Sequence, residues 1–569
     1  MKIISLCSAL SLGLLLTAQA EDIPWHTNRI LVSFSSSGLL TAGPGSFADD
    51  HNFTTLQATR LLPFFRLAWR DHRDVMTVLN EVIADARVAS AEPDYIRTAH
   101  GTPNDPLFPQ QWGPSIMHAP DAWDIEKGNT DIVTAVLDCG VDLSHPDLAN
   151  QFWVNADEIY GNNVDDDGNG YVDDYNGYDF ASGQFFSLPW AEDGGPSEHI
   201  ASHGTHVTGV IAAEQDNDQG ISGLAPNAKV MIVRVLNSLG TGYSSDIAEG
   251  IVYAVDNGAR VINLSLGGTG LSSMEYDAVK YAWGHGAVIV CSAGNSGDGL
   301  NTPEYPSSLP FCISVGATDP SDNIADFSTH NAFIELAAPG VDILSTTVQG
   351  QYQSDGWTGT SMSAPHVSGL AALLFSHYPG LANWQARLLL REAAIDRGSP
   401  GWDTYYGYGR ADAATLFSRE RAPDNQLTIL VPPANASFES TSLVGLLWNQ
   451  VSGAAHYSVR ILRDGKEVQN EIVTDTSFIV QSIRAKKPGN YNVVLEALDG
   501  SDGTISSAER HFVVRKPFTP EPDSGTATTP ATVTPSTAKK SKHSFGKNPS
   551  KSGKYRDYFK GKKPSKKTR

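Results

Sequence analysis

At 569 residues the chain is too long for a single hydrophobic core, so several domains are expected. Its charge is divided unevenly: residues 517–569 hold 13 Lys or Arg against 3 Asp or Glu, so the net charge of −22 leaves −32 on residues 1–516. An acidic body argues against nucleic acid as a partner, because phosphate contacts need a basic face, and it suits an exterior rich in calcium or salt.

Residues 1–20 have the pattern of a secretory signal peptide. Lys2 precedes a short apolar stretch over residues 3–17, and Ala18-Gln19-Ala20 supplies a small-x-small cleavage site. A membrane anchor is the alternative, but the apolar stretch is short for one. We therefore expect a protein exported to the extracellular space or the periplasm, with no membrane span in the mature chain.

Residues 21–101 are expected to fold as a small α+β unit. An apolar run at residues 30–34 indicates a strand, a helical pattern follows over residues 75–86, and the unit closes on residues 91–96.

The pattern changes from about residue 129. Short, continuously apolar strands such as 132–137 and 288–290 alternate with helical stretches such as 247–257, and Gly-rich turns separate them. This alternation predicts an α/β domain whose parallel sheet is covered by helices on both faces.

Residues 425–516 carry short alternating strands around Trp448, Tyr457 and Tyr491, which is typical of a small antiparallel β-sandwich. The pattern resembles a fibronectin type III domain. Such a domain could bind a carbohydrate or protein surface, or serve as a spacer. Because no exposed aromatic cluster can be identified, the sequence favours a spacer or unspecified binding.

Residues 517–569 are rich in Pro, Ser, Thr and Lys and hold few apolar residues, so they cannot bury a core and are expected to be disordered. This basic tail could be an electrostatic arm for anionic surfaces or merely a solvated terminus.

Three segments supply candidates for nucleophilic catalysis. Asp138 follows the predicted strand at residues 132–137, His203 lies in a His-Gly-Thr-His segment that opens a helix, and Ser361 opens another helix. In an open α/β sheet, functional groups gather outside the carboxyl ends of the strands. A serine hydroxyl is a weak nucleophile until an imidazole takes its proton, and the imidazole needs a buried carboxylate to fix its tautomer. We predict Ser361 as the nucleophile, His203 as the general base and then acid, and Asp138 as the orienting carboxylate.

These motifs, in the order Asp, His, Ser and separated by 65 and 158 residues, resemble those of the subtilase family of serine endopeptidases. The resemblance covers roughly residues 102–415. It implies a subtilisin-like domain at residues 102–418, hydrolysing protein and peptide substrates as a monomer through an acyl-enzyme. A non-catalytic scaffold is the competing class, but it would usually have lost a catalytic group.

The same resemblance assigns further site residues. The side-chain amide of Asn295 would stabilise the oxyanion together with the backbone N–H of Ser361. The edge that pairs with the substrate backbone would be formed by Ser265, Leu266 and Gly267, with Gly294 beside it.

Glu304 aligns with the base of the primary specificity pocket in this family. An acid there would favour Arg or Lys on the acyl side of the scissile bond, as in a specific processing protease. The alternative is a carboxylate at the rim of the pocket that points to solvent and has no effect.

An insertion at about residues 155–180 predicts a calcium site. Its acidic residues fall at alternate positions of an EF-hand-like loop, although position 12 holds Asn176 in place of Glu. Hard oxygen ligands without His or Cys suit Ca²⁺ better than Zn²⁺. A solvated acidic loop is the alternative, but charges this dense would repel one another without a cation. The expected ligands are Asp165, Asp167, Asn169, the Tyr171 carbonyl and Asp173.

The family resemblance implies a second calcium site near the start of the peptidase domain. Its ligands would be Asp105, Asp147, the side chain of Asn217, and the carbonyls of Glu214, Gln219 and Ile221.

By the same resemblance, residues 21–101 are an inhibitory propeptide that assists folding and occupies the substrate cleft until it is cut near residues 100–102.

Three cysteines remain after the signal peptide is lost, and an odd number in an oxidising compartment indicates one disulfide and one thiol. The family's sheet places Cys291 beside Cys312, so these two are expected to be bonded and Cys139 to be free.

Overall fold

The computed structural model describes residues 25–34, 44–58, 64–69, 71, 73–95, 102–182, 184–185, 198–297, 301–480 and 487–516. The expected signal peptide, most of the expected processing region and the basic tail lie outside these residues. Across the helices that are described, none combines the length and the apolar character needed to cross a membrane.

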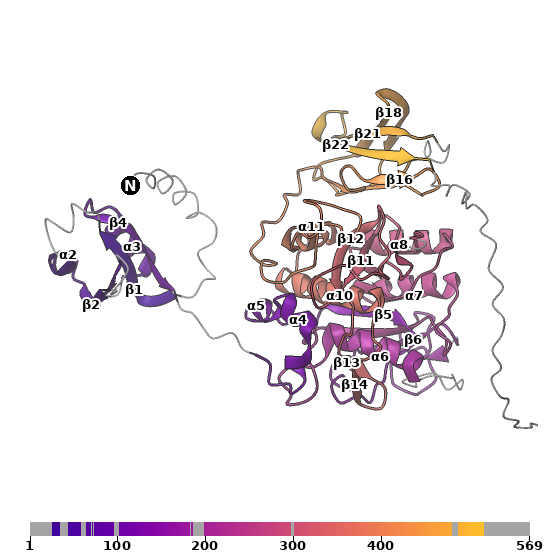
Figure 1. Cartoon of the computed structure of the whole chain (residues 1–569), viewed down its shortest axis with the longest axis horizontal. Helices are drawn as coiled ribbons and strands as arrows, with labels where there is room; N and C mark the ends of the chain where they lie inside the picture. Colours follow the sequence, from indigo (N-terminus) through magenta and orange to yellow (C-terminus); the bar gives the residue numbers. More distant parts are fainter. Residues whose placement is uncertain are drawn as a thin grey trace, which may run out of the picture. The chain divides into compact units, whose positions relative to one another are not determined.

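Residues 25–95 contain a four-stranded antiparallel sheet in the order β2-β3-β1-β4, together with two helices (Figure 1, indigo). One face of the second helix is buried, and its N-terminus is capped by Asp74, which accepts a hydrogen bond from the Thr77 N–H. The predicted α+β architecture is therefore observed, with these elements: β1 (Trp25–Phe34), α2 (Pro44–Asp50), β2 (Thr54–Ala58), β3 (Phe64–Ala68), α3 (Val75–Ile83) and β4 (Val88–Tyr95).

The central domain is built on an eight-stranded sheet in the order β12-β11-β10-β9-β5-β8-β6-β7, parallel except for β7, which pairs antiparallel with β6. Every residue of β5, β10, β11 and β12 is buried, as a parallel sheet covered on both faces requires. The predicted α/β class is confirmed. The strands are β5 (Val133–Asp138), β6 (Gly177–Asp179), β7 (Gln184–Phe185), β8 (Lys229–Arg234), β9 (Ala259–Leu264), β10 (Val288–Ser292), β11 (Cys312–Thr318) and β12 (Ile334–Pro339).

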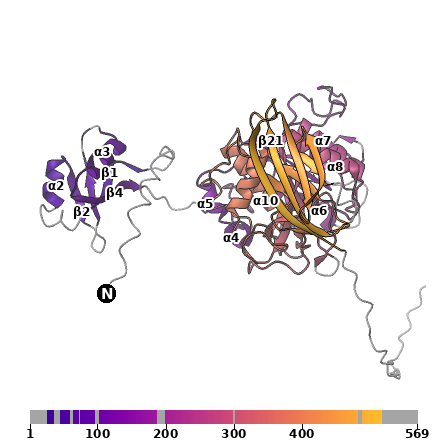
Figure 2. The ribbon, with the colours of Figure 1, turned by 90° about the horizontal axis from the view of Figure 1, so that it is seen from above.

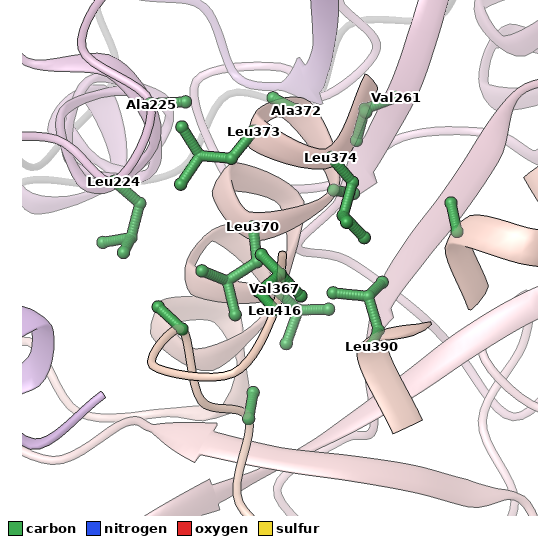
Figure 3. Packing of buried hydrophobic residues seen from close by; sticks show 14 of the residues in the cluster. Leu224, Ala225, Val261, Val367, Leu370, Ala372, Leu373, Leu374, Leu390 and Leu416 are labelled. Carbon is green, nitrogen blue, oxygen red and sulfur yellow. The ribbon is translucent and has the colours of Figure 1, made fainter. Parts of the chain in front are cut away.

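The helices divide between the two faces of this sheet because successive side chains of a strand point to opposite faces. In β10, Val288 and Val290 pack with α10, whereas Ile289 packs with α7 and α8. Figure 3 shows Val367, Leu370 and three following side chains of α10 at the centre of the first cluster. The remaining elements are η1 (Phe108–Gln110), α4 (Trp112–Ile116), α5 (Ala119–Trp123), α6 (Glu198–Ala212), α7 (Ser244–Asp256), α8 (Ser273–Gly284), β13 (Ser345–Thr347), β14 (Gln351–Gln353), α10 (Thr360–His377) and α11 (Asn383–Ala393).

Residues 429–515 form two sheets, β15-β17-β20 and β16-β22-β21-β18-β19, which share a core containing Trp448, Tyr457 and Tyr491. The long strands around β21 run side by side (Figure 2). The expectation of a wholly antiparallel sandwich is wrong at one edge, where β16 runs parallel to β22. The strands are β15 (Ile429–Val431), β16 (Ser437–Glu439), β17 (Gly445–Trp448), β18 (His456–Arg463), β19 (Lys466–Val473), β20 (Ser477–Ile479), β21 (Gly489–Leu498) and β22 (Thr504–Arg515).

The smaller sheet also packs against the central domain. Leu430 and Leu447 are fully buried in the same cluster as Phe311 and Trp384 of that domain. Gly445 lies so close to the domain that a Cβ atom there would fall 2.7 Å from Pro310 Cγ. A spacer would not share a core with its neighbour, so the structure does not support the spacer interpretation.

The expected Cys291–Cys312 disulfide is wrong: Cys139, Cys291 and Cys312 are all buried, and none of them is in a disulfide bond. In the parallel pairing of β10 with β11, Cys312 lies opposite Ile289, two residues before Cys291. From the usual strand spacing and rise, that offset places the two cysteine Cα atoms about 8 Å apart. A disulfide tolerates no more than about 7 Å, so this register does not favour a bond. The two thiols are nevertheless neighbours, and burial together with the Cys312 thiol raises the pKa of Cys291.

Candidate active site

The carboxyl end of β5 and helix α6 bring an acid and an imidazole together. Both carboxylate oxygens of Asp138 lie 2.9 Å from His203 Nδ1, and the acid is only 1% exposed. His203 is the sixth residue of α6, so the helix begins earlier than the sequence suggested. Gly204 allows this approach, because a Cβ atom there would lie 2.2 Å from Gly140 O.

This contact determines which ring nitrogen of His203 is basic. With Nδ1–H donating to Asp138, Nε2 carries the free lone pair. Burial lowers the pKa of His203, but the charge of Asp138 and the hydrogen bond outweigh it, so the pKa is raised. The ring is therefore a stronger proton acceptor than a free imidazole.

Ser361 is the second residue of α10, and its backbone position is fixed by a substitute hydrogen bond. Pro365 has no N–H to donate to the Ser361 carbonyl four residues earlier. The hydroxyl of Ser265 donates to that carbonyl instead, at 2.7 Å. The Ser361 hydroxyl donates to Ser265 O at 3.2 Å and makes no hydrogen bond to His203. A hydrogen bond between a catalytic serine and histidine often becomes short only when substrate binds.

Asn295 and the Ser361 N–H face a common space beside the nucleophile. The Asn295 Oδ1 atom accepts hydrogen bonds from Thr360 N–H and Oγ1–H at 2.9 and 3.1 Å, which orients the amide. A Cβ atom on Gly359 would lie 3.6 Å from Asn295 Nδ2 and 3.8 Å from Ser361 N. Glycine at that position therefore keeps open the space between two donors, as an oxyanion site requires.

A cleft of about 490 Å³ begins at Asp138 and His203 and runs along residues 265–268. Gly268 exchanges two backbone hydrogen bonds with Tyr305, of 3.0 and 2.7 Å. Before that bridge, Leu266 and Gly267 make no backbone hydrogen bond to another described residue. This edge is free to pair with an extended peptide.

Glu304 lies next to the cleft, between two glycines. A Cβ atom on Gly294 would fall 2.3 Å from Glu304 Oε1, and one on Gly267 would fall 3.2 Å from Oε2. Burial raises the pKa of this half-buried carboxyl, which has no hydrogen-bonding or cationic partner among the described residues. Both glycines therefore leave room for the acid, and Gly294, with φ at +104°, also has a backbone that favours glycine.

In the insertion, the structure gathers Glu158, Asp165 and Asp167, whose ligand atoms lie within 4.8 Å of one another. The Oε2 atom of Glu158 and the Oδ1 atom of Asp165 are buried without a hydrogen-bond partner. Glu158 itself is 5% exposed. Buried carboxylate oxygens that converge without a donor fit a hard cation such as Ca²⁺. The sequence pattern missed Glu158, which precedes the loop.

The other predicted ligands of this loop have different partners. Asp173 accepts hydrogen bonds from the backbone N–H groups of Asn162 and Asn163, at 3.0 and 2.7 Å. The Asn169 amide donates to the carboxylates of two neighbouring aspartates, at 3.0 Å each. The ring of Tyr171 packs edge-on against two other tyrosines. These contacts shape the loop around the three gathered acids, and the ligand roles of Asp173, Asn169 and the Tyr171 carbonyl stay predictions.

The residues of the second expected calcium site also lie together. Asp105 and Asp147 are 1% and 0% exposed, and the oxygens of both accept only neutral donors. Burial, with the nearby charge of Asp105, raises the pKa of Asp147 to about 6. Two buried acids without a cationic partner among the described residues fit a divalent cation. The other expected ligands each hydrogen-bond to Asp147 or to one another: Asn217, Glu214, Gln219 and Ile221.

A family model described as "Subtilase family" matches residues 129–409. The chain is 39% identical over 341 residues to the thermophilic serine proteinase of Bacillus sp. (strain AK1), covering 60% of this chain and 75% of that protein. It is 39% identical over 313 residues to thermitase of Thermoactinomyces vulgaris, covering 55% and 98%. Halolysin of Haloferax mediterranei is 38% identical over 334 residues, covering 58% of each chain.

Proposed function

The chain belongs to the subtilase family and is a serine-type endopeptidase, and we propose that it is secreted, processes itself and is stabilised by calcium. The observation that carries the catalytic assignment is the contact of His203 Nδ1 with both oxygens of Asp138, at the mouth of a cleft where Asn295 and Ser361 present hydrogen-bond donors.

The reaction follows from these positions. Ser361 Oγ attacks the carbonyl carbon of the scissile bond while His203 Nε2 takes the hydroxyl proton. The resulting oxyanion accepts hydrogen bonds from Asn295 Nδ2 and the Ser361 N–H. His203 then returns the proton to the leaving amine, which leaves an acyl-enzyme on Ser361. Water, deprotonated by the same imidazole, hydrolyses the ester. Asp138 keeps its charge and stabilises the imidazolium in both steps.

The test compares wild-type protein with Ser361→Ala on a peptide library, in the presence of calcium. Loss of a triad nucleophile costs about 10⁶-fold in turnover in a related system, so no cleavage by the variant is expected. Ser376→Ala is the matched control, because Ser376 lies on the same helix and its hydroxyl only donates to Ala372 O. Equal cleavage by wild type and Ser361→Ala would disprove the assignment.

Self-processing is supported by the compact α+β unit over residues 25–95 that precedes the peptidase domain. Ser361→Ala should keep this unit covalently attached, whereas the wild-type protein should lose it by a cut near residues 100–102. The signal-peptide pattern of residues 1–20 supports secretion to the extracellular space or periplasm.

Calcium would be held in the insertion by Glu158, Asp165 and Asp167, and near the domain start by Asp105 and Asp147. When bound, the ion supplies positive charge that offsets the repulsion between these carboxylates. The chain's own contribution is to orient the acids through backbone N–H groups and to bury Glu158, Asp105 and Asp147.

Glu304 supports a preference for Arg or Lys immediately before the scissile bond, because it is an acid beside the cleft without a partner among the described residues. Glu304→Gln should lower cleavage after Arg and Lys relative to cleavage after Leu or Phe. If the ratio of these two cleavage rates is unchanged, the Glu304 carboxylate lies at the rim of the pocket and has no role in specificity.

A further inference from the structure

A second carboxylate, Glu275, lines the cleft away from the catalytic pair. It lies in the first turn of α8 and is only 4% exposed. Among the described residues that line this cleft, none is Lys or Arg. A buried acid without a cation is costly, so its place in a substrate cleft needs an explanation.

Helix capping does not account for the carboxylate. Ser272 and Glu275 have the spacing of a capping box, in which the acid would accept a hydrogen bond from the Ser272 N–H. One half forms: the Ser272 hydroxyl accepts from the Glu275 N–H at 3.3 Å. The return bond is not made in the part of the chain that is described. The carboxylate instead accepts from the hydroxyl of Ser244, another residue that lines the cleft.

The pKa of Glu275 is consistent with a carboxylate that has no cation beside it among the described residues. Burial raises the pKa of Glu275, and the bond from Ser244 only partly offsets this. A guanidinium or ammonium group entering the cleft would supply the missing charge and several donors.

The position of Glu275 along the cleft indicates which part of a substrate reaches it. The contact between Ser361 Oγ and Ser265 O marks the end of the edge where the scissile bond lies. From Ser265 the edge continues to Gly268, three residues on and about 10 Å away for extended backbone. Gly270 and Glu275, which follow Gly268 in the chain, also line the cleft. A peptide paired with the edge therefore has its third or fourth residue near Glu275.

We propose that Glu275 is a second specificity-determining residue, which binds an Arg or Lys side chain three or four residues before the scissile bond. This rests on the proposed function, because the substrate must pair with residues 265–267 on its acyl side. With Glu304 beside the scissile bond, the cleft would then recognise two separated basic residues. Such a protein cuts selected basic sequences and leaves most other chains intact.

The experiment uses the full-length secreted protein with calcium. Wild type, Glu275→Gln and the control Glu467→Gln each digest a proteome-derived peptide library, and the cut sites are read by mass spectrometry. Glu467 is an exposed residue on β19, so the control makes the same chemical change away from the cleft. Wild type and control should show Arg and Lys enriched at the third or fourth position, and Glu275→Gln should lose this enrichment.

Two synthetic peptides that differ only by Arg or Gln at the enriched position then give the size of the effect. The ratio of their kcat/KM values should be about 10 to 100 in wild type, the range for a charge-assisted bond, and near 1 in Glu275→Gln. Glu275→Asp, which keeps the charge, should retain part of the ratio and covers the case in which the glutamine variant is not secreted.

Three results would overturn the proposal: no upstream enrichment in wild type, enrichment of apolar residues there, or an unchanged ratio in Glu275→Gln. None of these results contradicts the proposed function. That function fails only if the wild-type protein and Ser361→Ala cut the same bonds, or if neither cuts any.

Discussion

The packing of the β-sandwich against the central domain leads to a prediction about how the two unfold. Leu447 is fully buried among central-domain residues such as Phe311 and Trp384, whereas its neighbour Leu446, 1% exposed, points into the core of the sandwich itself. The two leucines are a matched pair, because a Leu→Ala change removes the same atoms from either core.

The cost of each change can be estimated from burial. Truncating a fully buried leucine destabilises a protein by about 2–5 kcal/mol, out of a total stability of about 5–15 kcal/mol. At Leu447 this loss falls on the shared cluster, so local opening around it should rise about 30-fold or more. At Leu446 the same change should destabilise mainly the two sheets of the sandwich.

Hydrogen exchange read by mass spectrometry separates the two cases, with all variants carrying Ser361→Ala to prevent self-digestion. Leu447→Ala should speed exchange in peptides that cover β11 and α11 of the central domain as well as β17. Leu446→Ala should act mainly on the peptides of residues 425–516. An effect of Leu447→Ala confined to residues 425–516 would refute the shared core and restore the spacer interpretation.

Three further outcomes are expected. Asn295→Ala should lower kcat about 100- to 1000-fold with little change in KM, because the amide acts on the oxyanion, and a change mainly in KM would contradict this. The kcat/KM value should fall as the pH drops through the raised pKa of His203, since protonated imidazole cannot accept the serine proton; Asp138→Asn should move this limb to lower pH. Removing calcium with a chelator should lower the melting temperature, and Glu158→Gln should reduce that difference while Glu467→Gln leaves it unchanged.

The catalytic groups could be predicted because each is set by local sequence. Asp138 ends a continuously apolar strand, Ser361 lies in the first turn of a helix that follows Gly359, and His203 lies in a His-Gly-Thr-His segment inside α6. Motif order then linked the three segments. The geometry added what local pattern does not contain, such as the role of Ser265 in replacing the hydrogen bond that Pro365 cannot make.

The errors arose where an inference depended on register or on what covers a surface. Cys291 and Cys312 were placed correctly on adjacent strands, but an offset of two residues cannot be read from either strand alone. Leu447 follows the alternation of a strand, and the sequence does not say which neighbour covers its outward face.

Glu158 and Glu275 are acids whose meaning depends on burial rather than on motif. In the sequence, Glu158 is one more acid ahead of a charged loop, and Glu275 completes a capping pattern that would explain it fully. Their burial, at 5% and 4% exposure, changes that interpretation, because a carboxylate is held away from water only at a cost. In each case the structure leaves the acid facing other oxygens or an open cleft and without a cation among the described residues, so the partner that offsets this cost should come from outside the chain: an ion for Glu158 and a basic substrate side chain for Glu275.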